Sequence, residues 1–505
     1  MMSVMKPNTN ANIKEIKKVA IANRGEVAVR VIRACQELGI KTVLLHSEAD
    51  TRTRAFRLSD ETVCIGPAEL SKSYLSIDNN IQGILSCGAD AVHPGFGFLS
   101  ENADFAQACL DNKITFIGPW PQAIRDLGDK ITAKNFVSEE KIPTIPGYNG
   151  ENQDSNFLMR ECEKIGYPVI VKAAAGGGGR GMKIIRDYKE AEELIKSAQR
   201  EAQSAFGSSQ VFLEKYLDAA KHIEVQVFGD LAGQVVHLYE RDCSAQRRHQ
   251  KVIEESIATT LDPELREQML AAAVRLAKKV NYVGAGTVEF LVQKGQYYFM
   301  EMNTRLQVEH PITEMVMGVD LVKAQILTMM SRTALWSQDK LKPRGHAIEC
   351  RICAEDPFTP GVPSTGEILF QKFPDGPGRR FDYGFDAGDP ITPYYDSMIA
   401  KVIVWDESRP RAIMKMIETL KETIIFGVKT NIPFLVEMLQ HPEFVDGSLN
   451  TNFIQTHFPT GAKEQPMTAQ ENLLVEKSVL TVKISGGEDS RQSSASPWTH
   501  AWRNS

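Results

Sequence analysis

The segment GTVEFLVQKGQYYFMEMNTRLQVEH, residues 286–310, carries acidic and amide residues at a spacing that suits metal binding. VEFLV and YYFMEM predict two strands joined by a turn at QKGQ. With Gly295 at the centre of that turn, Glu289 and Glu301 fall opposite each other among large apolar neighbours, an arrangement that needs a cation between the two charges. Asn303 shares the face of Glu301 because side chains alternate along a strand. Two carboxylates and an amide oxygen are hard ligands, so we predict a site for Mg²⁺ or Mn²⁺ here.

The alternation of polar and apolar residues continues beyond this hairpin. Residues that offer metal ligands, an anion-binding guanidinium and a carboxylate base share one predicted face: Glu301, Asn303, Arg305, Gln307 and Glu309. The other face carries Met302, Thr304, Leu306 and Val308. The competing interpretation is an exposed polar edge, and a register shift of one residue would remove the predicted opposition of the two glutamates.

A second candidate site is the glycine-dense stretch AAAGGGGRGMK, residues 173–183. Glycines let backbone N–H groups approach phosphates closely. The Walker pattern is absent because Met182 follows Gly181, and the stretch lies between two predicted strands rather than before a helix. These features favour a mobile flap, although a flexible surface hairpin is the alternative. Lys172, at the end of the preceding strand, is placed to reach a phosphate.

The segment ERDCSAQRRHQKVIEES, residues 240–256, contains a basic cluster formed by Arg247, Arg248, His249 and Lys251. A solvated turn or a nucleic-acid patch would also explain it. The net charge of −6 and the lack of neighbouring aromatic residues argue against nucleic acid. A pocket for a small anion, phosphate or bicarbonate, fits the cluster better.

The elements that must position these residues follow from hydrophobic periodicity. Residues 17–46 predict strand, turn, helix and strand, and similar alternation up to about residue 118 predicts a parallel sheet covered on both faces. The loop PGFGFLSEN, residues 94–102, follows a strand end, where such sheets place ligands. From about residue 144 the pattern becomes mixed: a small lid, a helix at 262–280, the hairpin at 284–303 and a further mixed domain.

Bulk properties agree with a multidomain globular protein. The 505 residues require two or three domains, because single cores stop growing near about 250–300 residues. No apolar run reaches the roughly 20 residues of a membrane span, and the N-terminus lacks an apolar signal core, so we expect no membrane and a cytoplasmic location. Eight scattered cysteines are no disulfide framework, and the lone Cys350–Cys353 pair predicts no zinc site. The polar tail, residues 461–505, is predicted to be flexible, with SVLTVKI and SPWTHAW as pieces that could dock on a partner.

Taken together, the motifs resemble the ATP-grasp superfamily and, within it, the biotin carboxylases. The resemblance spans about residues 16–458, in IANRGEVAVRVIRAC, HPGFGFLSENADFA, GDK, VIVKAAAGGGGRGM, ERDCSAQRRHQK, FMEMNTRLQVEHPITE, GHAIECRICAED and PYYDSMIAK. It implies an α/β and α+β chain with a doubly wound N-terminal domain, an ATP-grasp lid and core, and a C-terminal biotin carboxylase domain. The implied bounds are 14–127, 128–332 with a mobile lid at about 144–217, and 343–458. One departure is EESIAT, residues 254–259, which replaces a proline-containing stretch usual in the family.

The resemblance also implies roles for individual residues. Residues implied to bind ATP are Lys130, Lys172, Gly178, Gly179, Glu214, Leu217 through its backbone, His222, His249, Glu289 and Glu301. The last two, with Asn303, are the implied magnesium ligands, in agreement with the hairpin argument. Bicarbonate is implied to contact Lys251, Arg305, Gln307 and Val308. Glu309 is the implied base that deprotonates bicarbonate, and Arg351 the cation that stabilises the biotin enolate.

The implied reaction is carboxylation of biotin with ATP and bicarbonate, through carboxyphosphate. It is the first half-reaction of a multi-subunit acetyl-CoA, acyl-CoA or pyruvate carboxylase, and the acceptor is chosen elsewhere. The implied partners are a biotin carboxyl carrier protein, a carboxyltransferase subunit and a second copy of the chain. Two alternatives stay open: another ATP-grasp carboxylate–amine or carbamoyl-phosphate-type ligase, and a non-catalytic nucleotide-binding subunit.

The run RAIMKMIETL, residues 411–420, raises the question whether this chain itself carries biotin, because Lys415 lies between two methionines. A biotinylated lysine needs an exposed tight turn in a small β-domain. Ile413, Met416 and Leu420 instead recur at helical spacing, which predicts an amphipathic helix with the methionines in the core. We therefore predict that Lys415 is not biotinylated and that biotin arrives on a separate carrier.

Overall fold

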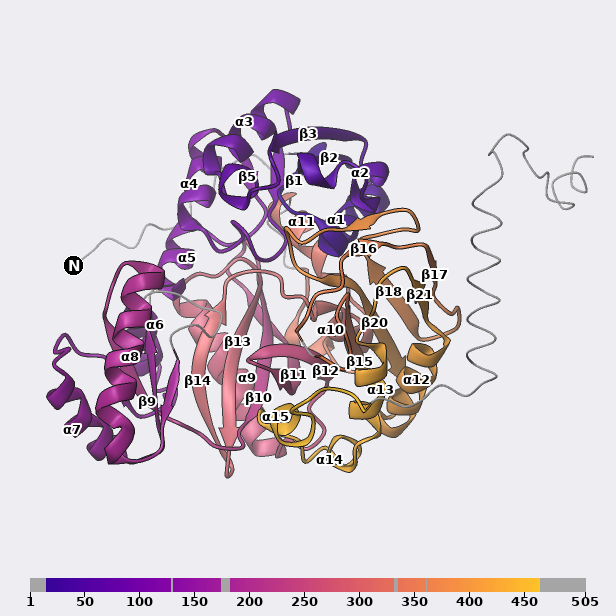
Figure 1. Ribbon diagram of the computed structural model, residues 1–505. Coiled ribbons are helices and arrows are strands. Elements are labelled where there is room, and N and C mark those ends of the chain that lie inside the picture. Colours follow the sequence, from indigo (N-terminus) through magenta and orange to yellow (C-terminus); the bar gives the residue numbers. More distant parts are fainter. Residues whose placement is uncertain (1–14, 129, 174–181, 331–334, 360, 464–505) are drawn as a thin grey trace, which may run out of the picture. The chain divides into compact units, whose positions relative to one another are not determined.

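The N-terminal region forms a five-stranded sheet in which every pair of neighbours is parallel, in the order β3-β2-β1-β4-β5. A computed structural model describes residues 15–128, 130–173, 182–330, 335–359 and 361–463 (Figure 1). The strands are β1 (Lys18–Ile21), β2 (Lys41–Ser47), β3 (Glu61–Gly66), β4 (Ala91–His93) and β5 (Thr115–Phe116). The helices are α1 (Gly25–Glu37), α2 (Arg54–Leu58), α3 (Ile77–Cys87), α4 (Ala103–Asp111) and α5 (Pro121–Gly128).

Both faces of this parallel sheet are buried, as the alternation of strands and helices predicts. Val19 and Ile21 pack on one face against apolar residues of α1 and of α11 (Leu321–Met330). Ala20 lies on the opposite face with residues of α3 and α4. Because neighbouring side chains of β1 enter different cores, the sheet is covered on both sides. The predicted doubly wound architecture is confirmed.

A second, smaller sheet is antiparallel and has the order β6-β9-β7-β8. Its strands are β6 (Gly147–Tyr148), β7 (Val169–Ala173), β8 (Lys183–Ile185) and β9 (Val211–Lys215). Apolar residues of α7 (Ser155–Ile165) and α8 (Tyr188–Phe206) pack with it in one core, and α6 (Lys130–Glu139) precedes it. The two predicted strands on either side of the glycine stretch are present and pair with each other, but Gly178 and Gly179 themselves lie outside the described residues.

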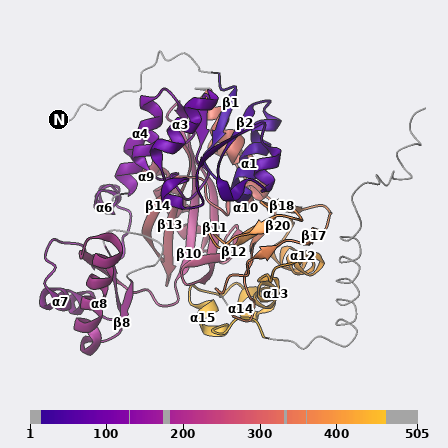
Figure 2. The same ribbon diagram turned by 45° about the horizontal axis from the view of Figure 1, so that its top comes forward.

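The largest sheet has eight antiparallel strands in the order β14-β13-β10-β11-β12-β15-β20-β18, several of which run side by side in Figure 2. The strands are β10 (Lys221–Gly229), β11 (Val235–Arg247), β12 (Gln250–Ser256), β13 (Gly284–Gln293), β14 (Gln296–Asn303), β15 (His346–Cys353), β18 (Arg379–Tyr383) and β20 (Met398–Asp406). Helices α9 (Pro263–Lys279) and α10 (His310–Met317) pack on it with α11. The β12–β15 pairing carries the sheet across the predicted domain boundary between residues 332 and 343.

The C-terminal part of the described chain covers the far end of this sheet with helices and two small ribbons. The helices are α12 (Arg409–Glu422), α13 (Ile432–Gln440), α14 (Pro442–Val445) and α15 (Phe453–His457). The ribbons pair β16 (Gly366–Glu367) with β19 (Pro390–Ile391), and β17 (Phe370–Lys372) with β21 (Ile424–Phe426). Three short 3₁₀ helices are η1 (Glu48–Asp50), η2 (Leu70–Lys72) and η3 (Gln338–Lys340). The predicted tail beyond residue 463 lies outside the described residues, and within them no helix is long and apolar enough to span a membrane.

Lys415 lies in the middle of α12, which confirms the predicted helix. Its ammonium donates to the carbonyl oxygen of Trp405 at 2.9 Å and pairs with Asp406 at 2.8 Å. Met416 is fully buried, as predicted, whereas Met414 is 60% exposed, so the prediction that both methionines belong to the core is wrong for Met414. A lysine held in this way on a helix is not presented on a tight turn.

Incubation with a biotin protein ligase, biotin and ATP is therefore expected to leave the purified chain unlabelled. The reason is that the Lys415 ammonium is engaged and its backbone is helical. A streptavidin blot makes the measurement, with a known biotin carrier domain in the same tube as positive control. Labelling of the chain that disappears in Lys415→Arg would contradict the prediction.

Candidate active site

The hairpin of β13 and β14 brings Glu289 and Glu301 directly opposite each other, as predicted. The path to that register differs from the prediction. The turn is a two-residue one at Lys294 and Gly295, both with positive φ, which alone would place Glu289 opposite Met300. A β-bulge at Met300 adds one residue to β14 and restores the predicted pair. Glu289 is buried, but Glu301 is exposed, so the prediction of large apolar neighbours around both is wrong for Glu301.

The polar residues that follow the hairpin converge on Glu289 although the strand does not continue. β14 ends at Asn303, and residues 304–309 have no regular secondary structure, so the predicted strand-like alternation stops there. The amide nitrogens of Asn303 and Gln307 nevertheless donate to Oε1 of Glu289 at 2.9 and 2.8 Å. Arg305 donates to the amide oxygen of Asn303 at 3.0 Å and to Glu101 of the PGFGFLSEN loop at 2.9 Å. The segment is thus ordered by side-chain contacts instead of a strand ladder.

Lys251 of β12 is the central cation of the site. Its ammonium contacts Glu224 and lies 2.9 Å from Glu289 and 2.6 Å from Glu309. Burial disfavours the charged ammonium, but these carboxylates outweigh burial and raise the pKa of Lys251 well above its usual value. Burial likewise opposes ionisation of Glu309, but Lys251 together with the neighbouring arginines outweighs burial, so the pKa of Glu309 is lowered. At neutral pH Glu309 is therefore an ionised carboxylate, the state that a base requires.

Arg351 of β15 lies on the other side of Glu309. Its guanidinium donates to Glu309 at 3.0 Å and to Glu254 of β12 at 2.6 Å. Glu254 stands opposite Glu349 in the β12–β15 register, and both are fully buried. Burial raises the pKa of Glu254 to about 7, although Arg351 opposes this, and burial raises the pKa of Glu349 well above its usual value. The guanidinium is thus fixed between two carboxylates with one edge toward Glu309.

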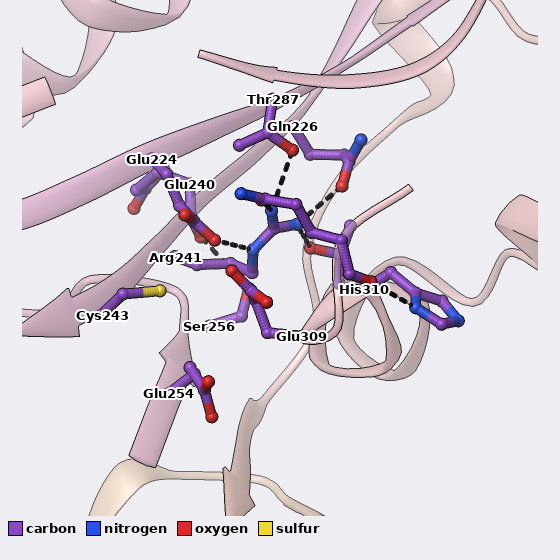
Figure 3. A network of polar contacts seen from close by, with 12 residues as sticks. Glu224, Gln226, Glu240, Arg241, Cys243, Glu254, Ser256, Thr287, Glu309 and His310 are labelled. Atoms are coloured by element: carbon purple, nitrogen blue, oxygen red, sulfur yellow. Dashed lines mark hydrogen bonds and ion pairs between the residues drawn. The ribbon is translucent and has the colours of Figure 1, made fainter. Parts of the chain in front are cut away.

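A buried arginine, Arg241, lies near Lys251, and the sequence motifs predict no role for it. Arg241 of β11 is completely buried, and Figure 3 shows its guanidinium surrounded by polar side chains. It donates at 2.5–3.1 Å to Glu224, Gln226, Thr287, Gln307 and Thr313. Since Glu224 bonds both Arg241 and Lys251, the two cations share one carboxylate. In the sequence Arg241 is the middle one of three consecutive charged residues, and its partners come from β10, β13, α10 and the segment after β14, so residue spacing does not identify it.

The residues predicted for the nucleotide come from both the small sheet and the eight-stranded sheet. The Lys172 ammonium pairs with Glu214 of β9 at 2.6 Å, and Leu217 follows that strand. His222 is buried with its Nε2 2.9 Å from Glu289. His249, in the positive-φ turn between β11 and β12, has a pKa lowered first by burial and then by the charge of Lys172.

The structure thus brings nine predicted site residues into two adjoining groups. One group is Lys172, Glu214 and His249, and the other is His222, Lys251, Glu289, Asn303, Gln307 and Glu309. Arg305 and Arg351 border the second group. Lys130 begins α6, but its side chain is outside the described part of the chain.

The oxygen donors of the hairpin fit a hard divalent cation. Glu289, Glu301 and Asn303 come from facing positions of one hairpin, and all offer oxygen. In the structure Oε1 of Glu289 accepts from Lys251, Asn303 and Gln307. Binding a metal therefore requires Glu289 to exchange part of these contacts, and Asn303 to turn its oxygen from Arg305 toward the ion.

This combination defines an ATP-grasp ligase: a parallel N-terminal sheet, a small sheet carrying Lys172 and Glu214, and an antiparallel core with opposed glutamates. Residues 129–332 match the family model described as carbamoyl-phosphate synthase L chain, ATP binding domain. Residues 15–124 and 349–456 match the models of the biotin carboxylase N-terminal and C-terminal domains. The chain belongs to the biotin carboxylase family of ATP-dependent ligases, so the resemblance seen in the motifs is confirmed.

Individual relatives agree with this assignment. The chain is 49% identical over 439 residues to the biotin carboxylase of Nostoc sp., which covers 87% of this chain and 98% of the relative. It is 48% identical over 449 residues to biotin carboxylase 1 of Bacillus subtilis, covering 88% and 100%. Among solved structures, the Campylobacter jejuni biotin carboxylase–β-γ-ATP complex has a TM-score of 0.85 and 44% identity, over 88% of this chain and 99% of that chain. The biotin carboxylase domain dimer of Hydrogenobacter thermophilus 2-oxoglutarate carboxylase, with MgADP, ADP and bicarbonate, has a TM-score of 0.85 and 44% identity, over 90% and 100%.

Proposed function

We propose that this chain carboxylates biotin on a separate carrier protein, using ATP, Mg²⁺ (or Mn²⁺) and bicarbonate. The observation that carries the proposal is the contact series Lys251–Glu309–Arg351 beside the glutamate hairpin, in which Glu309 is buried and both cations are half-buried. It provides a cation for an anionic substrate, an ionised base and a fixed guanidinium within one row. Neither a non-catalytic nucleotide-binding subunit nor a carboxylate–amine ligase requires all three.

On the nucleotide side, the chain's residues bind and orient ATP. Lys130 and Lys172 hold its phosphates under Gly178 and Gly179, while Glu214 and the Leu217 backbone bind the adenine. His222 and His249 contact the nucleotide at its ribose or phosphates. Because Lys172 and Glu214 are paired in the structure, ATP replaces that pairing. Glu289, Glu301 and Asn303 would hold the metal, which neutralises phosphate charge when bound.

Bicarbonate lies against Lys251, Arg305, Gln307 and Val308 in this proposal. Glu309 removes its proton, and the resulting oxyanion attacks the γ-phosphorus of ATP. The bond from that phosphorus to ADP breaks, which yields carboxyphosphate and ADP. The ionised state of Glu309 beside Lys251 suits it to this step.

Carboxyphosphate then separates into CO₂ and phosphate, and the phosphate takes the ureido N–H proton of biotin. The negative charge that develops on the ureido oxygen is stabilised by Arg351, whose guanidinium is already oriented by Glu254. The ureido nitrogen forms the new bond to the carbon of CO₂. Exclusion of water by the small sheet protects carboxyphosphate from hydrolysis.

Assembly and location complete the proposal. The partners are a biotin carboxyl carrier protein and a carboxyltransferase subunit, with a homodimer supported by the dimer of the Hydrogenobacter relative. The acceptor is acetyl-CoA, another acyl-CoA or pyruvate, and the location is cytoplasmic. The domains are residues 14–127, 128–332 with a lid at about 144–217, and 343–458, followed by the tail at 461–505.

Purified protein with ATP and Mg²⁺ is expected to release ADP at a rate that rises when free biotin and bicarbonate are both present. Biotin without bicarbonate should give little release, because the group that attacks ATP comes from bicarbonate, and bicarbonate without biotin should give less release than the two together. A coupled ADP assay with bicarbonate-depleted buffer makes the comparison. ADP release that ignores biotin but responds to an amine would favour a carboxylate–amine ligase, and nucleotide binding without any release would favour a non-catalytic subunit.

A further inference from the structure

Lys401 of β20 is a second buried cation beside the candidate site, and no role has been assigned to it. Its side chain is completely buried. The ammonium donates to the carbonyl oxygen of Val308 at 2.7 Å and pairs with Glu26 of α1 at 3.2 Å. Lys401 also stands opposite Arg351 in the β15–β20 register, so the two cations share one face of the sheet.

The Val308 carbonyl belongs to the segment of residues 304–309, which lacks a strand or helix ladder. Val308 is half-buried, and a carbonyl that accepts from an ammonium gains one of the stronger hydrogen bonds available. The residues on either side, Gln307 and Glu309, make the contacts to Glu289 and Lys251 described above. A displacement of Val308 therefore moves both of these side chains.

Three parts of the chain meet at the Lys401 ammonium. Glu26 comes from the first turn of the first helix, and the Phe96 ring of the PGFGFLSEN loop has its centroid 5.9 Å away. Val308 comes from the ATP-binding core, and Lys401 itself from β20. Burial disfavours the charged ammonium, but Glu26 and other nearby acids outweigh it, so the pKa of Lys401 is raised and the cation persists.

We propose that Lys401, held by Glu26, is a positioning residue that fixes the Gln307–Glu309 segment against Arg351 and so sets the affinity for bicarbonate. The proposal rests on the proposed function. It differs from general structural support because the contact is made to the one segment that carries bicarbonate-site residues without a backbone ladder.

The test compares Lys401→Met with Lys415→Met. Methionine keeps the apolar stem and removes the ammonium. Lys415 is the matched control because it also bonds a backbone carbonyl and pairs with an acidic side chain, Asp406, but on α12 and away from Val308. In Lys401→Met the KM for bicarbonate is expected to rise by about 10-fold to 100-fold, the range for losing a hydrogen bond to a charged group. In the same variant the KM for ATP should stay unchanged, as should the affinity for ADP measured by calorimetry. Lys415→Met should change neither the KM for bicarbonate nor the KM for ATP.

A second readout is independent of turnover. Amide hydrogen exchange of residues 304–309 should become faster in Lys401→Met and stay as in the parent in Lys415→Met. If folded Lys401→Met has the same exchange rates at residues 304–309 and the same KM for bicarbonate as the parent protein, the proposal is overturned. If Lys401→Met fails to fold, Glu26→Gln is the variant to measure. A rise in its KM for bicarbonate alone would support the proposal, and a KM for bicarbonate equal to that of the parent protein would refute it. Absence of biotin-stimulated ATP cleavage in the parent protein would instead refute the proposed function, and the exchange comparison would still judge Lys401.

Discussion

Glu309→Ala is expected to lower bicarbonate-dependent ATP cleavage by about 10²–10⁴-fold, the contribution of a general base, while ATP still binds. The substitution removes the ionised carboxylate between Lys251 and Arg351. Lys251 keeps its contacts to Glu224 and Glu289, so the cation and the hairpin stay in place. The measurement is ADP release against bicarbonate concentration, together with calorimetric ATP binding.

Glu240→Ala is the matched control for this variant. Glu240 is also a buried glutamate paired with an arginine, Arg266 at 2.8 Å, but it makes no contact with Lys251 among the described interactions. It should lose stability without losing activity per folded molecule. Loss of ATP binding in Glu309→Ala, or retention of full bicarbonate-dependent turnover, would show that Glu309 does not have the assigned role.

Arg351→Ala should separate the two halves of the reaction. Some bicarbonate-dependent ATP cleavage is expected to survive, because Lys251 and Glu309 remain in contact. Formation of carboxybiotin should fall by about 10²–10³-fold, the loss typical for removing one group that stabilises a developing oxyanion. Labelled bicarbonate followed into acid-labile carboxybiotin, alongside ADP release, measures both halves in one reaction.

Removing Arg351 also leaves Glu254 buried without its cation, which can disturb the site by itself. The double variant Arg351→Ala/Glu254→Gln removes that charge as well and should show the same loss of carboxybiotin. Arg266→Ala, on helix α9, serves as the control for deleting a paired arginine away from the site. Undiminished carboxybiotin in Arg351→Ala would exclude Arg351 from the mechanism.

The β13–β14 hairpin shows which part of the site geometry the sequence predicts and which part it does not. Strand periodicity and a glycine turn correctly predict that Glu289 faces Glu301. The same reasoning assumes a regular ladder, whereas the structure uses a shorter turn and a bulge at Met300. A bulge leaves no periodic signature, because it depends on how neighbouring strands and helices pack around the extra residue.

The convergence of Gln307 and Glu309 on the site was also predicted, although for a strand that does not exist. Polar residues in this segment are held by partners on other strands, so their meeting survives the loss of alternation. No role was predicted for Arg241 and Lys401, because their partners include residues 66 to 375 positions away in the sequence. Residue spacing predicts local geometry well. Pairs between residues far apart in the sequence are predicted only through family motifs.

The β12–β15 pairing has a consequence for how this protein can be divided. Four residue pairs, from Ile253–Cys350 to Ser256–Ala347, join the ATP-binding core to the C-terminal region. In a chain that ended before β15, β12 would be an unpaired edge strand, with a row of free N–H and C=O groups available for edge-to-edge association. Such a chain would also leave Glu254 without Arg351. The two regions therefore have to be expressed as one block, and the junction of any engineered gene fusion has to lie outside the β12–β15 pairing.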